Sequence, residues 1–291
     1  MWRYERTKAC RKLGRLIFEI IEDNYSRSFT SASELSILLG VDSFTYMISD
    51  ANRQARLLKD YTLEKHLGQE VEVKKILSGD KHLNAAFRSV LLGIDNPNAT
   101  LIPESFYQER ERKQYLEHLM PMRNDMAIFT DTLNGQSAKN VFGVKANLLS
   151  LFEEHLPGFH ILHFSTALMR ALESHAQVNP GHQIYLYLRT KSVRILLFDN
   201  GKVKFSNSFQ FSGVKDVLYY LLLVFKQHGL DNAQTPVFLL GQLMRDSEMF
   251  RLLHRYIGKL FFFEHGASTK MGNKLAKMPS WFFYDVLSLN T

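Results

Sequence analysis

The sequence predicts an α/β protein built from two similar halves. Two stretches, residues 35–63 and 184–211, each have the pattern of three short strands joined by tight turns. In the second stretch, Asn200-Gly201 is a strong hairpin signal, because both residues tolerate the positive φ of a two-residue turn. In each half, helix and strand patterns follow the three strands. The chain has 291 residues and 45% apolar residues, enough for two lobes with separate cores.

We expect residues 2–24 to form an amphipathic helix. Apolar residues recur there at helical spacing and would share one face: Leu13, Leu16, Ile17, Ile20 and Ile21. Cations would occupy the other face: Arg3, Arg6, Lys8, Arg11, Lys12 and Arg15. That basic face could touch an anionic membrane surface, although a helix packed on the protein and facing water is preferred.

The segment between the two three-stranded units alternates between strand and helix patterns. In order, we expect a helix at 64–78, strands at 86–93 and 99–102, a polar helix at 104–119, a hairpin of strands 125–133 and 137–143, a helix at 145–155, a strand at 158–164 and a helix at 165–175. Ser165 or Thr166 would cap the last helix, which would connect the two halves.

The second half continues with strand, glycine turn and helix. We expect an apolar helix at 214–228 that ends at Gly229, a strand at 236–240, a turn at Gly241, a helix at 245–257 and a strand at 259–263. Ligands of α/β layers bind at strand ends and helix N-termini, so these turns are candidate site positions. Residues 266–277 are polar and basic and are expected to be a flexible loop before residues 281–289 dock.

This order of elements resembles the two-lobed nucleotide-binding fold of actin, hexokinase and Hsp70, a duplication of ribonuclease-H-like βββαβα units. The segments LSILLGVDSFTY, LPGFHILHFSTALMRAL and MPSWFFYDVLSL are also similar to an uncharacterised family of Bacteroidetes proteins with an actin-like ATPase fold. More distantly, the chain resembles the pilus-assembly and cell-division actin-like proteins. After the N-terminal helix, assigned to residues 1–30, the resemblance implies two lobes, residues 31–164 and 165–291.

The resemblance also implies a degenerate nucleotide cleft. In the first hairpin of each lobe, the actin-like family carries an Asp followed two residues later by a Gly. These pairs fall at Leu38 and Gly40, and at Tyr187 and Arg189, so only Gly40 is retained. Mg²⁺ is usually held by carboxylate oxygens, which Leu38 and Tyr187 cannot supply. The side chain of Arg189 would also fill the space through which backbone N–H groups approach a phosphate.

A later family signature, consecutive glycines that face the adenosine, falls at Gly241 and Gln242. The vestigial cleft would be lined by Leu38, Gly40, Tyr187, Arg189, Gly213, Gly241 and Gln242. We expect no catalytic residue, no metal ligand and no cofactor there. The alternative is a nucleotide-binding protein or slow ATPase that uses ATP with Mg²⁺ through other ligands, with these candidates: Asp42, Asp50, Asp199, Arg189, Gly213 and Gly241.

Three cations lie close together in the second hairpin, at Arg189, Lys191 and Arg194. They could bind an anion by charge, and at the rim of a partly filled cleft they would suit an acidic peptide. The other interpretation is that all three are ordinary surface cations.

Other site chemistry is weakly indicated. His155, His160 and His163 are close in sequence but no carboxylate set accompanies them, so a metal site is not favoured. Ser165 and Thr166 lack the G-x-S-x-G context of a nucleophile, and no Walker or G-x-G-x-x-G loop occurs. The single cysteine, Cys10, excludes an internal disulfide and favours a reducing compartment, the cytoplasm. No apolar run approaches the ~20 residues of a membrane span.

The sequence therefore predicts a degenerate actin-like module without ATP hydrolysis that serves as a protein-interaction or scaffolding component. The net charge of +7 and the isoelectric point of 9.3 favour acidic partners. A protein partner is expected and nucleic acid is not. The oligomeric state stays open.

Overall fold

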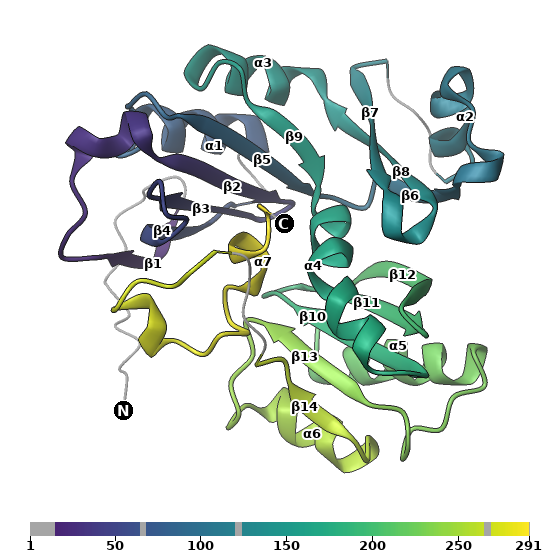
Figure 1. Ribbon diagram of the computed structural model, residues 1–291. Helices are drawn as coiled ribbons and strands as arrows, with labels where there is room; N and C mark the ends of the chain where they lie inside the picture. Colours follow the sequence, from purple (N-terminus) through teal and green to yellow (C-terminus); the bar gives the residue numbers. More distant parts are fainter. Residues whose placement is uncertain (1–14, 65–67, 120–123, 265–268, 291) are drawn as a thin grey trace.

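The computed structural model describes residues 15–64, 68–119, 124–264 and 269–290 (Figure 1). They form two lobes, one above the other in Figure 1, and each lobe is built around a mixed β-sheet flanked by helices. Helix α4 (Phe164–Val178) lies between the lobes and connects them. The architecture is α/β and two-lobed, as the sequence predicts.

The first lobe contains a six-stranded sheet. Its strands, in sheet order, are β1 (Arg15–Ile21), β4 (Ala55–Thr62), β3 (Ser43–Ser49), β2 (Glu34–Gly40), β5 (Ser89–Asp95) and β9 (His160–His163). Strands β2, β3 and β4 are antiparallel, whereas β5 and β9 run parallel to β2. Helices α1 (Gln69–Gly79) and α3 (Ala146–His155) pack together against this sheet. Strands β2 and β3 are buried on both faces, which explains their nearly continuous apolar sequence.

The second lobe repeats this plan. Its five strands, in sheet order, are β12 (Lys202–Gln210), β11 (Ser192–Asp199), β10 (His182–Leu188), β13 (Val237–Gly241) and β14 (Leu260–Phe262). Helices α5 (Val214–Gln227) and α6 (Glu248–Tyr256) contact each other and cover one face. Apart from β1, the strand order of the first sheet is identical to that of the second. The duplicated three-stranded unit is therefore confirmed.

A small third sheet is inserted between β5 and α3. Its strands, in sheet order, are β6 (Ala99–Pro103), β8 (Ala138–Lys145) and β7 (Met126–Leu133). The predicted hairpin turn at Asn134-Gly135 is confirmed, as a short 3₁₀ turn between β7 and β8. The single polar helix predicted over 104–119 is wrong. The segment forms 3₁₀ turns at Glu104–Phe106 and Glu109–Glu111 before α2 (Arg112–Glu117).

The predicted N-terminal helix is wrong over its second part, because Arg15–Ile21 form strand β1. Strand β1 pairs antiparallel with β4 and extends the sheet. Phe18 and Ile20 pack on the core between the lobes, while Ile21 packs on the core of the first lobe. The apolar residues thus pack on both faces of a strand. The segment forms a strand and not a helix because it pairs with the open edge of β4. The first part of the predicted helix lies outside the described residues.

The connecting helix α4 is confirmed, but its cap differs from the prediction. The N-cap is His163, whose imidazole accepts a hydrogen bond from the backbone N–H of Ser165. Ser165 and Thr166 lie inside the first turn and are buried. None of the helices in the described part of the chain is long and apolar enough to cross a bilayer.

The C-terminal segment returns to the first lobe and then enters the space between the lobes. The backbone carbonyl of Lys270 accepts a hydrogen bond from Ala55, and the carboxylate of Glu22 accepts from the backbone of Lys274 and Leu275. The described part of the predicted loop is therefore tied to the first lobe. Helix α7 (Tyr284–Leu287) follows and contacts strands β2, β3 and β13, so it touches both lobes.

Candidate functional site between the lobes

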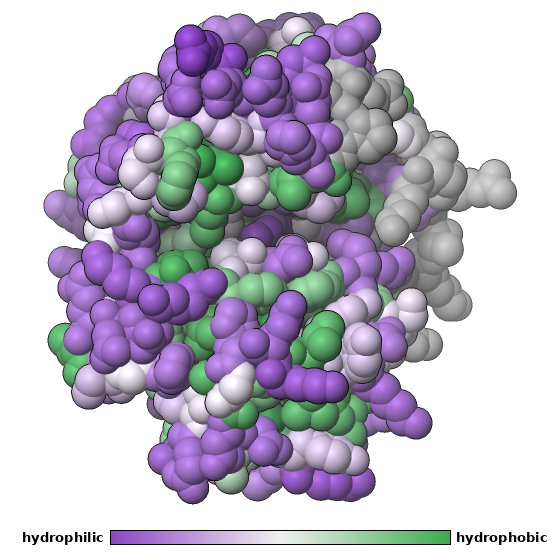
Figure 2. All heavy atoms as spheres, turned by 90° about the vertical axis from the view of Figure 1, so that its right-hand side faces the viewer, coloured by the Kyte–Doolittle hydropathy of each residue, from purple (hydrophilic) through white to green (hydrophobic). Residues whose placement is uncertain are grey.

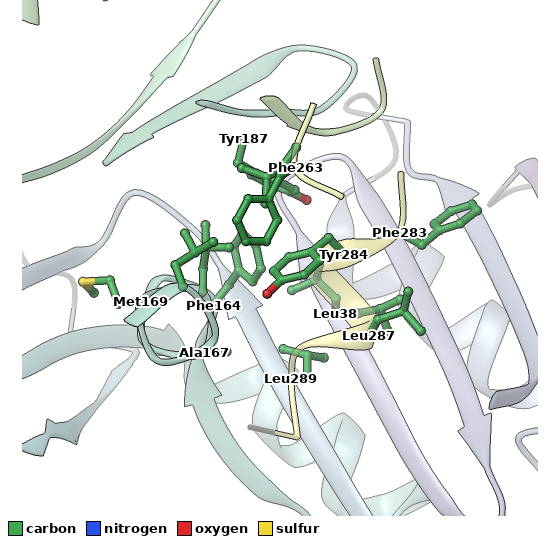
Figure 3. Close-up of a cluster of buried hydrophobic side chains, with 14 of the residues drawn as sticks. Leu38, Phe164, Ala167, Met169, Tyr187, Phe263, Phe283, Tyr284, Leu287 and Leu289 are labelled. Atoms are coloured by element: carbon green, nitrogen blue, oxygen red, sulfur yellow. The ribbon is translucent and has the colours of Figure 1, made fainter. Parts of the chain in front are cut away.

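The two positions predicted to have lost the metal-holding aspartates meet at the lobe junction. Leu38 of β2 and Tyr187 of β10 belong to one buried cluster, with 0% and 2% of their surface exposed. Figure 3 shows Phe164 of α4 beside Tyr187, and their ring centroids are 4.8 Å apart. Both positions are therefore parts of an apolar core and do not line an open cleft.

The C-terminal segment fills this junction. Tyr284, Leu287 and Leu289 are almost fully buried and lie beside Leu38 in Figure 3. The fit at the strand end is close, because a Cβ atom on Gly93 of β5 would lie 2.7 Å from Cδ2 of Leu289. The chain itself thus occupies the space between the ends of β2 and β10.

Arg189 forms a buried ionic link across the junction. Its Nη1 donates to Oδ2 of Asp285 at 2.8 Å, and its Nη2 donates to Oδ1 of Asp60 at 3.2 Å and to Oγ1 of Thr45 at 3.1 Å. The hydroxyl of Tyr187 donates to the same oxygen of Asp285 at 2.6 Å. Asp60 and Thr45 belong to the first lobe, so Arg189 joins the second lobe, the first lobe and the C-terminal helix.

Burial and charge oppose each other in this network. Burial disfavours the charged guanidinium, but the surrounding oxygens of Tyr187, Asp285 and Asp60 outweigh it and hold the pKa of Arg189 above its ordinary value. Burial raises the pKa of Asp285, while the nearby Arg189 opposes that change. Removing one member of such a buried pair leaves an uncompensated charge, at a cost of about 3–5 kcal/mol.

The end of β13 completes the link between the lobes. Gln242 donates from Nε2 to Oδ2 of Asp60 at 3.0 Å. Gly241 has a φ of +90°, and a Cβ there would lie 2.1 Å from the carbonyl oxygen of Leu188. Its N–H donates to the carbonyl of Trp281 at 2.8 Å, so the residue that would face an adenosine binds the C-terminal segment. Local backbone geometry is sufficient reason for this glycine.

The two remaining glycines have separate surroundings. The carbonyl of Gly40 accepts a hydrogen bond from Nε2 of Gln69 at 2.7 Å. Gly213 is the exposed N-cap of α5, and its N–H donates to Oδ2 of Asp216 at 3.1 Å. The carboxylate of Asp216 also accepts from the N–H of Ser212, so it caps the start of this helix.

The sequence left two interpretations open for Arg189, Lys191 and Arg194, an anion-binding cluster or ordinary surface cations. Neither interpretation fits the two arginines, because both are buried. Arg194 is 6% exposed, like Arg189, and its Nη2 donates to Oδ1 of Asp95 in the first lobe at 2.7 Å. The guanidinium also lies 5.9 Å from the ring centroid of Phe164. Only Lys191 is exposed. Two of the three cations are internal ion-pair members that tie the lobes together.

The aspartates that could have bound Mg-ATP in place of the family's residues do not lie together at one site. Asp42 lies in the turn before β3 and Asp50 follows the other end of that strand, where it pairs with Arg56 at 2.6 Å. Asp199 ends β11, at the opposite end of that strand from Arg189. Within the described ranges, no group of three or more His, Cys, Asp or Glu side chains could hold a metal ion.

Sequence reasoning missed the acidic partners Asp60, Asp95 and Asp285. Asp285 carries a local signal, because a lone carboxylate within WFFYDVLSL must be paired if that segment is buried. The identity of its partner, 96 residues away, depends on the fold.

Comparison with known proteins confirms the predicted fold. A crystal structure of a Bacteroides thetaiotaomicron protein, described as having an actin-like ATPase fold and unknown function, matches with a TM-score of 0.79 at 19% identity and covers 92% of this chain and 99% of that one. The PilM–PilN type IV pilus biogenesis complex matches with a TM-score of 0.57 at 14% identity, over 89% of this chain and 98% of that one. None of the curated proteins matches the sequence. Residues 22–260 match the family of proteins of unknown function DUF3822, and the chain belongs to that family.

Proposed function

We propose that this chain is a degenerate actin-like module that does not hydrolyse ATP and acts as a protein-interaction or scaffolding component. The observation that carries the proposal is the filled lobe junction. Leu38 and Tyr187 take the positions of the family's aspartates, and α7 with Leu289 packs against them. On this reading, the residues Leu38, Gly40, Tyr187, Arg189, Gly213, Gly241 and Gln242 are remnants of a nucleotide cleft.

The ion pair of Arg189 with Asp285 opposes nucleotide binding at the junction. A nucleotide at the junction would have to displace α7 and separate the guanidinium from Asp285, at a cost of about 3–5 kcal/mol for the ion pair alone. Each 1.4 kcal/mol weakens binding about tenfold, so the loss is about two to three and a half orders of magnitude. A site of this kind would retain little nucleotide affinity even if every other contact were preserved.

A similar structure supports an interaction role. The PilM relative occurs in a complex with PilN, which is consistent with a partner-binding use of this fold.

The compartment and the class of partner are also part of the proposal. The single cysteine of this chain is consistent with a reducing compartment, the cytoplasm. A protein partner fits this proposal better than nucleic acid, because the two best-placed cations of the second hairpin are engaged by Asp60, Asp285 and Asp95.

The test is thermal unfolding of the full chain with and without millimolar Mg-ATP, together with a phosphate-release assay. A ligand at about one hundred times its dissociation constant stabilises the native state by ~2.7 kcal/mol, which shifts a melting temperature by several degrees. We expect no shift and no phosphate release. A magnesium-dependent shift would contradict the proposal and favour a nucleotide-binding protein or slow ATPase.

A further inference from the structure

A second feature of the molecule is an open groove between the lobes, away from the filled junction. Its volume is about 480 Å³, and Figure 2 shows the face on which the molecule is hollowed between its upper and lower halves. Strand β6 and the turn between β7 and β8 line one wall, and β12 lines the other. Ser165 and Met169 of α4 lie at its base, together with Arg194.

Both walls are open sheet edges. Strand β6 lies at one edge of the three-stranded sheet, and β12 lies at one edge of the five-stranded sheet. An edge strand presents unpaired N–H and C=O groups that can pair with another extended chain.

The pairing register of β12 determines which of its backbone groups point away from β11. The N–H of Phe211 donates to the carbonyl of Lys191, and hydrogen-bonded pairs alternate with non-hydrogen-bonded pairs along an antiparallel ladder. Ser206 and Ser208 therefore occupy non-hydrogen-bonded positions, where N–H and C=O point away from β11. The N–H of Ser208 accordingly donates to the side chain of Asn207 and not to the ladder. All three of these residues line the groove.

Strand β6 has the same property. The N–H of Gly143 donates to the carbonyl of Asn98, which makes Ala99 and Leu101 the non-hydrogen-bonded positions opposite β8. Their backbone groups point away from β8, and both residues line the groove. The groove therefore has outward-facing backbone donors and acceptors on both walls.

The charge of the groove specifies the kind of ligand. Among the described residues that line it, the charged ones are Arg194 and Lys204. Arg194 is buried and already pairs with Asp95, so the exposed Lys204 is the cation that a ligand in the groove can reach. The first fourteen residues of the chain carry five Lys or Arg and one Glu. Their net positive charge makes them a poor ligand for a groove whose charged side chains are also cations.

We propose that this groove binds an extended, acidic peptide segment of a partner protein, which adds a strand to β12 and brings a carboxylate to Lys204. Main-chain hydrogen bonds would supply affinity, and the charge of Lys204 would supply selectivity. The inference rests on the proposed interaction function and names its binding site.

The first experiment selects peptides on the full chain from a displayed library of random linear peptides of about ten residues, the length of a long strand. We expect an acidic consensus. Ser206→Pro removes one outward N–H without removing a ladder bond and should weaken binding of a selected peptide about tenfold, whereas Ser206→Ala should not. An absence of binders, a consensus without Asp or Glu, or equal binding to both variants would overturn the proposal.

A second experiment changes only the peptide, which covers the case in which Ser206→Pro does not fold. In an added strand, alternate N–H groups face β12, so N-methylation of one alternating set should weaken binding about tenfold and methylation of the other set should not. Lys204→Glu should also lower affinity, with Lys215→Glu on the exposed side of α5 as the matched control. Equal effects of the two methylated sets would exclude strand addition.

The two proposals fail in different ways. If no peptide binds and Mg-ATP causes no thermal shift, the groove inference is wrong and the interaction function stands. If Mg-ATP shifts the melting temperature, the proposed function is wrong, whatever the peptides do.

Discussion

At the residue scale, Arg189 ties the second lobe to the first lobe and to helix α7. It stands where the family resemblance implies a glycine, and its guanidinium is held by Asp60 and Asp285. Arg189→Met keeps similar bulk but leaves both carboxylates buried without their cation. We expect a loss of about 3–5 kcal/mol in the free energy of unfolding, measured by urea titration.

The matched control is Lys191→Met, two residues away and exposed, which should change stability by less than about 0.5 kcal/mol. Asp285→Asn combined with Arg189→Met should cost less than the sum of the two single changes, because each removes the other's partner. Additive losses would show that the ion pair does not stabilise the junction. The triple variant Leu38→Asp, Tyr187→Asp and Arg189→Gly would bury two new carboxylates and remove the cation that pairs with Asp60 and Asp285. We therefore expect this variant to unfold and not to restore a magnesium site.

The sequence could place these residues but not pair them. The family resemblance places Leu38 and Tyr187 at equivalent strand positions, and the structure brings them into one cluster. The sequence gives no direct measure of burial for an arginine. In the sequence, Arg189 and Arg194 resemble ordinary surface cations, because their partners Asp60, Asp285 and Asp95 lie far from them along the chain.

At the element scale, the accuracy of the prediction follows the strength of local signals. The hairpin turns at Asn134-Gly135 and Asn200-Gly201 and the apolar helix α5 are encoded within a few residues, and the structure confirms all three. Strand β1 was missed because its state depends on the edge of β4, about 40 residues away. The C-terminal segment was expected to dock, but its place between the lobes depends on the completed fold.

The packing of that segment can be tested with a size exchange. A methyl group on Gly93 would meet Leu289, so Gly93→Ala should destabilise the chain by about 1–3 kcal/mol by overpacking. Leu289→Ala should cost about 2–5 kcal/mol by leaving a cavity. The double variant should be more stable than Leu289→Ala alone, because the new methyl group fills part of that cavity. A double variant that loses the sum of both effects would place Leu289 away from Gly93.

At the scale of the whole molecule, the lobes share one core. The inter-lobe cluster contains Leu38 of the first lobe, Tyr185 of the second, Phe164 of α4 and Tyr284 of the C-terminal segment. The ion pairs of Arg189 with Asp60 and Arg194 with Asp95 span the same junction. Two lobes joined by a nucleotide cleft can move against each other, whereas lobes joined by a common core cannot separate without exposing it.

We therefore expect both lobes to unfold in a single transition. For 291 residues the calorimetric enthalpy near 60 °C should be about 200 kcal/mol. In a two-state transition the van't Hoff enthalpy equals it, whereas lobes that unfold independently give a ratio of calorimetric to van't Hoff enthalpy of about two. Arg194→Met with Asp95→Asn removes one inter-lobe ion pair without leaving a charge unpaired, and should lower the melting temperature while the ratio stays near one. Two resolved transitions in differential scanning calorimetry would mean that the filled junction does not couple the lobes, and that the space between them can still open.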